Sequence, residues 1–352
     1  MKHVLAIAAV SLLLTACDAE DRNLIDQAPE DPLIRAEGQR YFERLEAEAT
    51  KTLQQLKRPF IAEKVFSGGD TSDARYFDTL LSGASSYRIT GSRGTAPLME
   101  FTVYDGKFGL HDESKMISSL TEEQISVEDG RFEIVLSPTQ PAEAQNWMQT
   151  SPDARYLMIR QYSHNWDTTI GASFSLETLS QNATPDNFAT ISEQEFIYNL
   201  ASHWKDTVDL MRWFPANNLI DVPTWLAQTM PAGHRFAAGE FLLEEDEVMV
   251  VEFHPPKAPY WGFQLTNYWF EPIDYGRSGS HLNNQTAKTD TDGLVRLYVS
   301  PTRVDHCNWI DTRGHRIGTM QFRLSRAYEL ELPSFDIEVK NSENLDLQYT
   351  CQ

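Results

Sequence analysis

The sequence predicts a mainly β fold with helical insertions: β-sandwich or jelly-roll-like modules, an N-terminal helix and a central helical segment. Short runs rich in Tyr, Ile, Val and Phe, separated by Gly, Asp and Ser, fill residues 76–185 and return from Gly239. Such runs are typical of strands joined by turns. Apolar residues recur at helical spacing in residues 34–56 and 193–214. With 352 residues, the chain is long enough for two domains or one large β domain.

The N-terminus has the features of an export signal. Lys2 precedes an apolar run, Val4–Leu14, that is too short to span a bilayer as a helix. The following Leu-Thr-Ala-Cys, residues 14–17, resembles the bacterial lipobox. That resemblance implies that residues 1–16 are a lipoprotein signal peptide and that Cys17 is lipidated, carrying palmitate among its acyl chains. A plain signal peptide with an accidental cysteine is the alternative. Asp18, by resemblance to the lipoprotein sorting rule, implies the periplasmic face of the inner membrane.

The charge balance limits the partners of the chain. It has 51 acidic against 30 basic residues and a net charge of −21. No basic stripe is available to neutralise phosphates, so nucleic acid is excluded as a partner. Attraction to anionic lipid is excluded for the same reason. A lipid anchor followed by an acidic tether, residues 17–33, would hold such a protein at a membrane without a basic surface.

Two helical segments are expected. Residues 34–60 form the N-terminal helix, which Pro59 ends. Its apolar positions are Tyr41, Phe42, Leu45, Ala49, Leu53 and Leu56. The central helical segment is residues 187–232, where Ser192 and Glu195 form a capping box.

Two β regions flank the central helical segment. The first, residues 61–186, contains Asp129-Gly130, a hairpin signal between apolar runs. The second, residues 233–335, contains Asp292-Gly293 as a turn, and an acidic tail, residues 336–352, follows. The expected strands lie in residues 85–94, 97–105, 125–137, 155–166, 247–255, 259–270, 293–301 and 318–327. We see no internal repeat of fixed period.

Four stretches together resemble a known bacterial family. They are YRITGSRGTAP (87–97), DARYLMIRQY (153–162), YWGFQLTNYWFEPIDY (260–275) with Leu282-Asn283, and NWIDTRGHRIGTMQFR (308–323). They resemble the family known as domain of unknown function 1214, in its longer form with an N-terminal β portion, and residues 233–335 are the domain most similar to it. The resemblance implies a β-sandwich or jelly-roll fold and carries no activity.

The stretch Tyr260–Glu271 holds six aromatic residues in twelve positions. As a strand it would be central in its sheet, with Trp261, Phe263 and Leu265 on the core face. The opposite face would carry Gln264, Thr266 and Tyr268 into a cleft, where amides orient a ligand and an aromatic ring stacks on it. A strand buried on both faces is the alternative.

The candidate site residues lie on this strand, the loop after it and residues 305–315. The expected ligand-binding residues are Gln264, Tyr268, Tyr275 and Asn283, and the candidate catalytic residues are Glu271, Asp274, Asp311 and His315. Paired carboxylates could perform acid–base chemistry on a glycosidic bond. The common nucleophile, phosphate-loop and zinc signatures are missing from the sequence.

No metal and no cofactor is expected. His254, His281, His306 and His315 with Asp311 match no metal-ligand spacing. Arg160 and Arg323, in mid-strand, are each expected to pair with a buried carboxylate rather than with a ligand.

If Cys17 carries lipid, Cys307 and Cys351 remain as a pair in an oxidising compartment. We expect a disulfide between them, with two free thiols as the alternative.

These observations favour a membrane-anchored envelope lipoprotein that binds a small or glycan-like ligand in a cleft lined by residues 261–275 and 305–315. One alternative is a hydrolase or lyase that uses the carboxylates and histidine of that cleft. The other is a structural envelope protein without a ligand, whose aromatic residues all belong to the core.

Overall fold

The computed structural model describes residues 24–65, 67–181, 191–222, 230–231, 233–273, 279–345 and 347. Cys17, Asp274, Tyr275 and Cys351 therefore lie outside the described residues, as does the expected signal peptide, residues 1–16. None of the helices in the described ranges is both long enough and apolar enough to cross a membrane.

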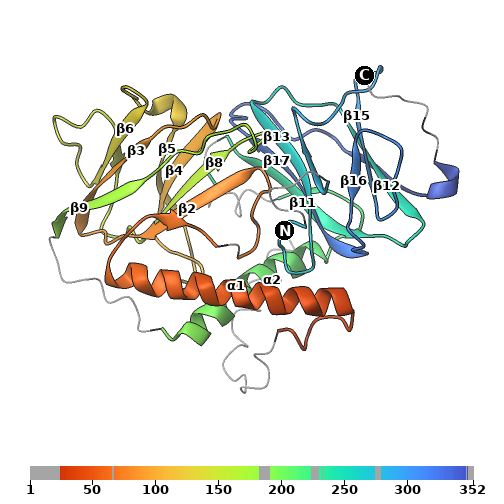
Figure 1. Cartoon of the computed structure of the whole chain (residues 1–352), viewed down its shortest axis with the longest axis horizontal. Coiled ribbons are helices and arrows are strands. Elements are labelled where there is room, and N and C mark those ends of the chain that lie inside the picture. The colour runs from red at the N-terminus through yellow and green to blue at the C-terminus, as the bar shows by residue number, and fades with distance from the viewer. Residues whose placement is uncertain are drawn as a thin grey trace, which may run out of the picture.

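Two helices form one layer of the molecule. Helix α1, Pro32–Lys57, begins where the Asp31 side chain accepts hydrogen bonds from the backbone N–H groups of Leu33 and Ile34. Helix α2, Glu193–Met211, begins at Ser192, whose hydroxyl accepts from the Glu195 N–H. The two helices pack together, and α1 runs along the same side of both β modules (Figure 1). Both predicted helices are therefore confirmed.

The first β module, called here the N-module, is a sandwich of two sheets. Its five-stranded sheet has the order β1 (Ala62–Glu63), β2 (Ala74–Leu80), β8 (Tyr156–Tyr162), β4 (Leu98–Tyr104), β5 (Met116–Thr121). Its four-stranded sheet has the order β7 (Trp147–Gln149), β6 (Arg131–Ser137), β3 (Ser85–Ser92), β9 (Ser175–Gln181). A single apolar core that includes Ile89, Phe101, Ile134 and Ile159 lies between the two sheets.

The second β module, the C-module, has the same construction. Its five-stranded sheet has the order β10 (Ile220–Asp221), β11 (Arg235–Leu242), β17 (Ile317–Ser325), β13 (Tyr260–Thr266), β14 (His281–Asn283). Its four-stranded sheet has the order β16 (Trp309–Asp311), β15 (Val295–Ser300), β12 (Glu247–Phe253), β18 (Asp336–Asn341). The mainly β class with helical insertions is thus confirmed.

Two edge strands lie in segments that were expected to be helical or to form a tail. Ile220 and Asp221, expected in the helical segment 187–232, form β10 beside β11. Residues 336–341, expected in the acidic tail, form β18 beside β12. Both additions cover strand edges whose backbone groups would otherwise lack partners.

The two modules are a duplication, because β1–β9 correspond in order to β10–β18. The sheet orders are identical under this correspondence, and in each module one pair of strands is parallel, β6 with β7 and β15 with β16. The turns at Asp129-Gly130 and Asp292-Gly293 also correspond, and both glycines have positive φ. Our expectation of no internal repeat is therefore wrong.

A repeated asparagine makes the same hydrogen bonds in both modules. Asn146 donates from Nδ2 to the carbonyls of Ser126 and Glu133 and accepts the Ser126 N–H at Oδ1. Asn308 does the same with Lys288 and the Arg296 carbonyl. Both stand in the pattern Asn-Trp-x-x-Thr, at 146–150 and 308–312, which is the trace of the duplication in the sequence.

The modules meet through the outer faces of their five-stranded sheets. Tyr260 of β13 packs on Tyr162 of β8, with ring centroids 5.2 Å apart. Arg326, just after β17, pairs with Glu100 of β4 at 3.0 Å. The outer faces, which in isolated sandwiches would meet water, are thus buried in this protein.

Strand β13 is buried on both faces. Trp261, Phe263 and Leu265 lie in the core of the C-module, as expected. The face with Gln264 and Thr266, expected to open into a cleft, is buried against the N-module, so the open-face expectation is wrong. β13 lies between β17 and β14, next to the middle strand of its sheet.

The aromatic stretch stops being a strand at Thr266. The Asn267 side-chain oxygen accepts from the N–H groups of Trp269 and Glu271, which bends the chain, and Phe270 has a φ of 64°. Trp269 consequently leaves the sheet and packs on α1, where its Nε1 donates to the Ile34 carbonyl. The predicted alternation of faces therefore fails after Thr266.

Candidate functional site

One polar pocket lies where the loop before β2 meets the C-module. We call it the inter-module pocket; it is lined by Thr71, Asp73, Tyr260, Gly262, Phe263, Gln264, His281 and Arg323. In this conformation the space between its side chains is too narrow to admit a water molecule. The pocket thus combines a loop of one module with β13, β14 and β17 of the other.

Hydrogen bonds from the Gln264 side chain hold the loop of residues 67–73 against the five-stranded sheet of the C-module. Its Oε1 accepts the Ser72 N–H at 2.8 Å, and its Nε2 donates to the Asp70 carbonyl at 2.8 Å. The same amide nitrogen lies 3.1 Å from Gln321 Oε1. Gln264, predicted to bind ligand, therefore already uses its amide to hold the pocket together.

Asp73 is the centre of the polar contacts. Its Oδ2 accepts hydrogen bonds from the Tyr260 hydroxyl and from Asn283 Nδ2, each at 3.0 Å. Its Oδ1 lies 3.3 Å from His281 Nε2. Burial, and then the negative charge of Asp73, raise the pKa of Tyr260 well above its ordinary value, so this phenol stays protonated as a donor. Asn283, another predicted ligand-binding residue, is thus brought to the pocket as a support for Asp73.

Four buried polar atoms at or beside the pocket have no hydrogen-bond partner among the described residues. They are Thr71 Oγ1, His164 Nε2, His281 Nδ1 and Gln321 Nε2. Buried polar atoms in proteins are normally satisfied by protein, water or ligand. These atoms are sealed from solvent in this conformation, and the pocket has no room for a water molecule beside them.

Arg323 completes the pocket with a positive charge. Its Nη2 donates to the Gly69 carbonyl and to Gln321 Oε1, each at 2.7 Å, and its guanidinium lies over the Phe236 ring. In the described part of the chain no carboxylate forms an ion pair with it, so the predicted pairing is wrong for Arg323. It is correct for Arg160, whose Nη1 lies 3.2 Å from Glu100 Oε1.

The described candidate catalytic residues, Glu271, Asp311 and His315, do not line this pocket. Glu271 is buried beside Arg44 of α1, with Oε1 3.1 Å from Arg44 Nε, and its Oε2 accepts from Asn267 at 3.2 Å. Burial outweighs the attraction of Arg44 and raises the pKa of Glu271 to about 7. Helix α1 thus covers this carboxyl.

Asp311 and His315 are likewise engaged by their surroundings. Asp311 Oδ2 pairs with Arg313 at 2.9 Å. His315 Nε2 lies 3.0 Å from Glu37 Oε1 of α1, and its Nδ1 lies 2.6 Å from the Thr312 carbonyl. The expected cleft between residues 261–275 and 305–315 is therefore filled by contacts with α1 and within the turn.

Tyr268 lies in a different pocket, which we call the helical pocket. Its lining includes Tyr41, Trp204, Lys205, Arg212, Tyr268 and Trp269. The Arg212 guanidinium lies 4.2 Å from the centre of the Tyr268 ring and pairs with Asp209 and Glu240. Tyr268 and Gln264, predicted to share one cleft, are thus separated, because the chain turns after Thr266.

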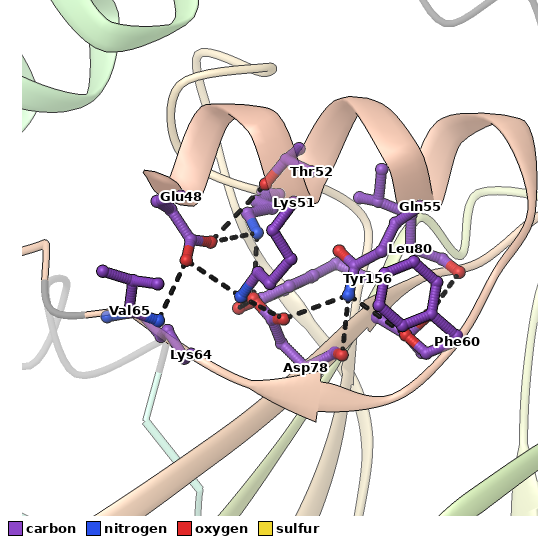
Figure 2. A network of polar contacts seen from close by, with 12 residues as sticks. Glu48, Lys51, Thr52, Gln55, Phe60, Lys64, Val65, Asp78, Leu80 and Tyr156 are labelled. Atoms are coloured by element: carbon purple, nitrogen blue, oxygen red, sulfur yellow. Dashed lines mark hydrogen bonds and ion pairs between the residues drawn. The ribbon is translucent and has the colours of Figure 1, made fainter. Parts of the chain in front are cut away.

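A charge network joins α1 to the N-module, with Glu48, Asp78 and Lys107 buried and Lys51 nearly so (Figure 2). Lys107 pairs with Glu48 at 2.8 Å and with Asp78 at 2.9 Å, and Lys51 pairs with the same two carboxylates. Burial would raise the pKa of Asp78, but the two ammonium groups outweigh it and hold the pKa far below its usual range. Neither pocket is lined by residues of this network. We therefore interpret it as structural: it holds α1 against the five-stranded sheet of the N-module.

Metal chemistry finds no support in the part of the chain that the structure describes, where no group of three or more His, Cys, Asp or Glu side chains could hold an ion. Cys307 is disulfide-bonded. Cys351 lies outside the described residues, so the pairing of Cys307 with Cys351 stays a prediction.

Sequence reasoning missed Thr71 and Asp73 as site residues. They belong to a loop of small and polar residues, SGGDTSD at 67–73, which carries no motif. Only their position in space, beside a strand nearly two hundred residues further along the chain, indicates their importance.

Comparison with known proteins confirms the resemblance and extends it to both modules. The family described as protein of unknown function, DUF1214, matches residues 71–165 and 237–329. An uncharacterised protein from Burkholderia cenocepacia has a similar crystal structure, with a TM-score of 0.82 and 28% identity over 92% of this chain and 94% of that one.

A more distant structure is similar in fold alone. The VPA0106 protein from Vibrio parahaemolyticus has a TM-score of 0.50 and 13% identity over 86% of this chain and 97% of that one. No curated protein matches this chain.

Proposed function

This chain belongs to the DUF1214 family, and from that premise we propose that it is a binding protein of the bacterial cell envelope. Lipidated Cys17 anchors it to the membrane, with Asp18 favouring the periplasmic face of the inner membrane. It takes a small polar or glycan-like ligand at the inter-module pocket, which must open to admit it.

The observation that carries this proposal is the cluster of unsatisfied atoms. Thr71 Oγ1 and His281 Nδ1, at the pocket, and Gln321 Nε2, on the neighbour of Gln264, are buried without hydrogen-bond partners among the described residues. Leaving such a group unsatisfied costs about 1–3 kcal/mol. A ligand with several hydroxyl groups can recover this cost, because hydroxyls both donate and accept.

The anchor is supported by the lipobox-like residues 14–17, and the chain that follows limits how far the fold can lie from the membrane. Leu24, the first described residue, is buried in the apolar cluster of α1 and α2. It lies seven positions after Cys17, a reach of roughly 25 Å at most. A lipid on Cys17 therefore keeps the helical layer close to the membrane.

The test of binding compares two buried threonines. Thr71 and Thr150 are both 3% exposed, and both hydroxyls lack partners among the described residues, but only Thr71 lines the inter-module pocket. We expect Thr71→Val to lower the affinity for a bound hydroxylated probe about tenfold, whereas Thr150→Val leaves it unchanged. Neither change should destabilise the fold, because no hydrogen bond is lost.

The measurement is ligand-observed NMR of the full-length protein in detergent, with glycerol, glucose, glycerate and glucuronate as probes. A probe signal that is weakened by Thr71→Val and kept in Thr150→Val supports the proposal. If no probe binds, or if both variants bind like the native protein, the pocket is not a ligand site and the structural alternative is favoured.

A second candidate function is acid–base catalysis, which one observation favours. Asp73 Oδ1 lies 3.3 Å from His281 Nε2, while His281 Nδ1 has no hydrogen-bond partner among the described residues. An imidazole that is oriented by a carboxylate and has its other nitrogen in a pocket can act as a general base. Slow conversion of a bound probe that is lost in His281→Gln, with binding kept, would identify a hydrolase or lyase.

A further inference from the structure

The chain leaves helix α2 through a turn that exposes two aromatic side chains. Trp213 and Phe214 follow the helix closely, and they are 80% and 43% exposed. Of the tryptophans that the structure describes, only Trp213 is exposed. In the described part of the chain, no other two exposed large apolar residues are adjacent in the sequence. Exposed apolar residues scattered singly are ordinary, whereas adjacent aromatic rings indicate a contact surface.

Strand β11 holds this turn on both sides of the aromatic pair. Before the pair, Arg212 Nε lies 3.0 Å from Glu240 Oε1. After it, the Asn217 side chain accepts from the Leu242 N–H at 2.9 Å and donates to the Leu242 carbonyl at 2.8 Å. Residues 213–216 are therefore fixed at both ends, and the fold itself presents the two rings to the outside.

The turn also lies close to the start of the described chain. Leu24 and Arg212 line the helical pocket together, and Trp213 is the residue after Arg212. Leu24 is seven positions after Cys17, so a lipid on that cysteine would attach within roughly 25 Å of it. Helices α1 and α2 form one side of the molecule (Figure 1). The aromatic pair is therefore near the place where the anchor would enter the bilayer.

The size of the aromatic surface favours a lipid partner over a second copy of the chain. An aromatic side chain buries about 150–250 Å² when it is fully covered. Trp213 and Phe214 together thus offer at most about 500 Å², whereas a stable protein interface takes about 800 Å² from each partner. A bilayer surface sets no such requirement, because single tryptophan rings settle between its headgroups and acyl chains.

The charges around the turn show that such a contact would be apolar. Arg212 is paired with Asp209 and Glu240, so it is already balanced by the chain. The net charge of −21 repels anionic lipids. Contact with lipid at this turn therefore depends on the aromatic rings and not on electrostatic attraction.

We propose that Trp213 and Phe214 insert into the surface of the membrane that carries the anchor and fix the orientation of the protein on it. This inference rests on the proposed lipid at Cys17. A single point of attachment holds a protein at a membrane without setting which face is turned to it. With the aromatic pair inserted as a second contact, the helical layer faces the lipid and the two β modules lie on the side away from the bilayer.

The test uses the full-length, lipidated protein in phosphatidylcholine vesicles, whose lipids carry no net charge. Tryptophan fluorescence is compared between vesicles with ordinary and with brominated acyl chains, because bromine quenches only rings that contact lipid. The signal of Trp213 is the difference between the native protein and Trp213→Phe. We expect brominated lipid to remove most of this difference signal and aqueous iodide to leave it unchanged.

The matched control places a tryptophan at another exposed position. Ile170, on the loop between β8 and β9, is 68% exposed. Ile170→Trp, made in the Trp213→Phe protein, should give a signal that iodide quenches and brominated lipid does not. Both positions are exposed, so neither change removes a core contact, and urea unfolding of the variants checks that they fold.

The outcomes separate this inference from the anchor on which it rests. A Trp213 signal quenched by iodide and not by brominated lipid shows a ring in water, which refutes the inference and leaves the anchor standing. A signal protected from both quenchers shows a ring covered by protein, such as a second copy, and refutes it too. Quenching of Ile170→Trp by brominated lipid refutes the fixed orientation. Protein that does not remain with the vesicles refutes the anchor and the inference together.

Discussion

Replacing Glu271 by glutamine should stabilise the protein at alkaline pH and have little effect at acidic pH. Glu271 is 4% exposed, and burial raises its pKa from the usual 4.5 to about 7. The charged groups acting on it are Arg44, which lowers the pKa, and Glu37 and Asp70, which raise it. Glutamine has nearly the same shape and keeps an oxygen for Asn267, but it never carries a charge.

The direction of the effect follows from proton binding. Between pH 4.5 and about 7 the folded protein holds a proton on Glu271 that the unfolded chain has lost, so the stability linked to this residue falls as the pH rises. It is fully present below pH 4.5 and is lost as the pH passes about 7. The rise from 4.5 to about 7, at about 1.4 kcal/mol for each pKa unit, corresponds to about 3 kcal/mol.

The assay is urea unfolding of the native protein and Glu271→Gln at pH 4.5, 6 and 8. We expect the advantage of the variant to grow by about 3 kcal/mol between the lowest and the highest pH. Glu123→Gln, at an exposed glutamate, is the control and should show no such growth. An advantage of Glu271→Gln that stays constant with pH would refute the reasoning, because the buried carboxyl would then not take up a proton on folding.

Three further predictions concern the anchor, the core and the charge network. Cys17→Ser should release the protein from membranes and abolish incorporation of labelled palmitate, and unchanged fractionation would contradict the anchor. Phe263→Ala should cost about 3–5 kcal/mol in urea unfolding, because Phe263 is fully buried in the C-module core; a cost near zero would place it outside the core. Lys107→Met should cost about 3–5 kcal/mol, because it leaves Glu48 and Asp78 buried with one ammonium group fewer. An equally stable variant would show that Lys51 alone balances both carboxylates.

The local elements could be predicted because their causes are local. Ser192 caps α2 through a hydrogen bond three residues away, and Asp129-Gly130 makes a tight turn closed by the backbone hydrogen bonds between Glu128 and Arg131. The residues before this turn form no strand, so the expected hairpin of two strands is wrong. The core face of β13 followed from the alternation of Trp261, Phe263 and Leu265, since a sandwich buries one apolar face of each strand.

The duplication was also present in the sequence but too faint to notice. The pattern Asn-Trp-x-x-Thr recurs at 146–150 and 308–312, while most other equivalent positions have changed. Glu100 and Gly262 show the extent of the change, because one module holds a buried carboxylate where the other has no side chain. Divergence of this kind preserves the strand order and erases the repeat.

The sequence by itself determined the class of fold, both helices, eight of the eighteen described strands and the resemblance to DUF1214. The tertiary structure alone decided where the site lies. A polar strand face looks the same in a sequence whether it meets water or a second module, and Gln264 meets the loop of Ser72, 192 positions away. Hydrogen bonds and ion pairs over such separations depend on how two modules dock, and no local pattern of residues records that docking.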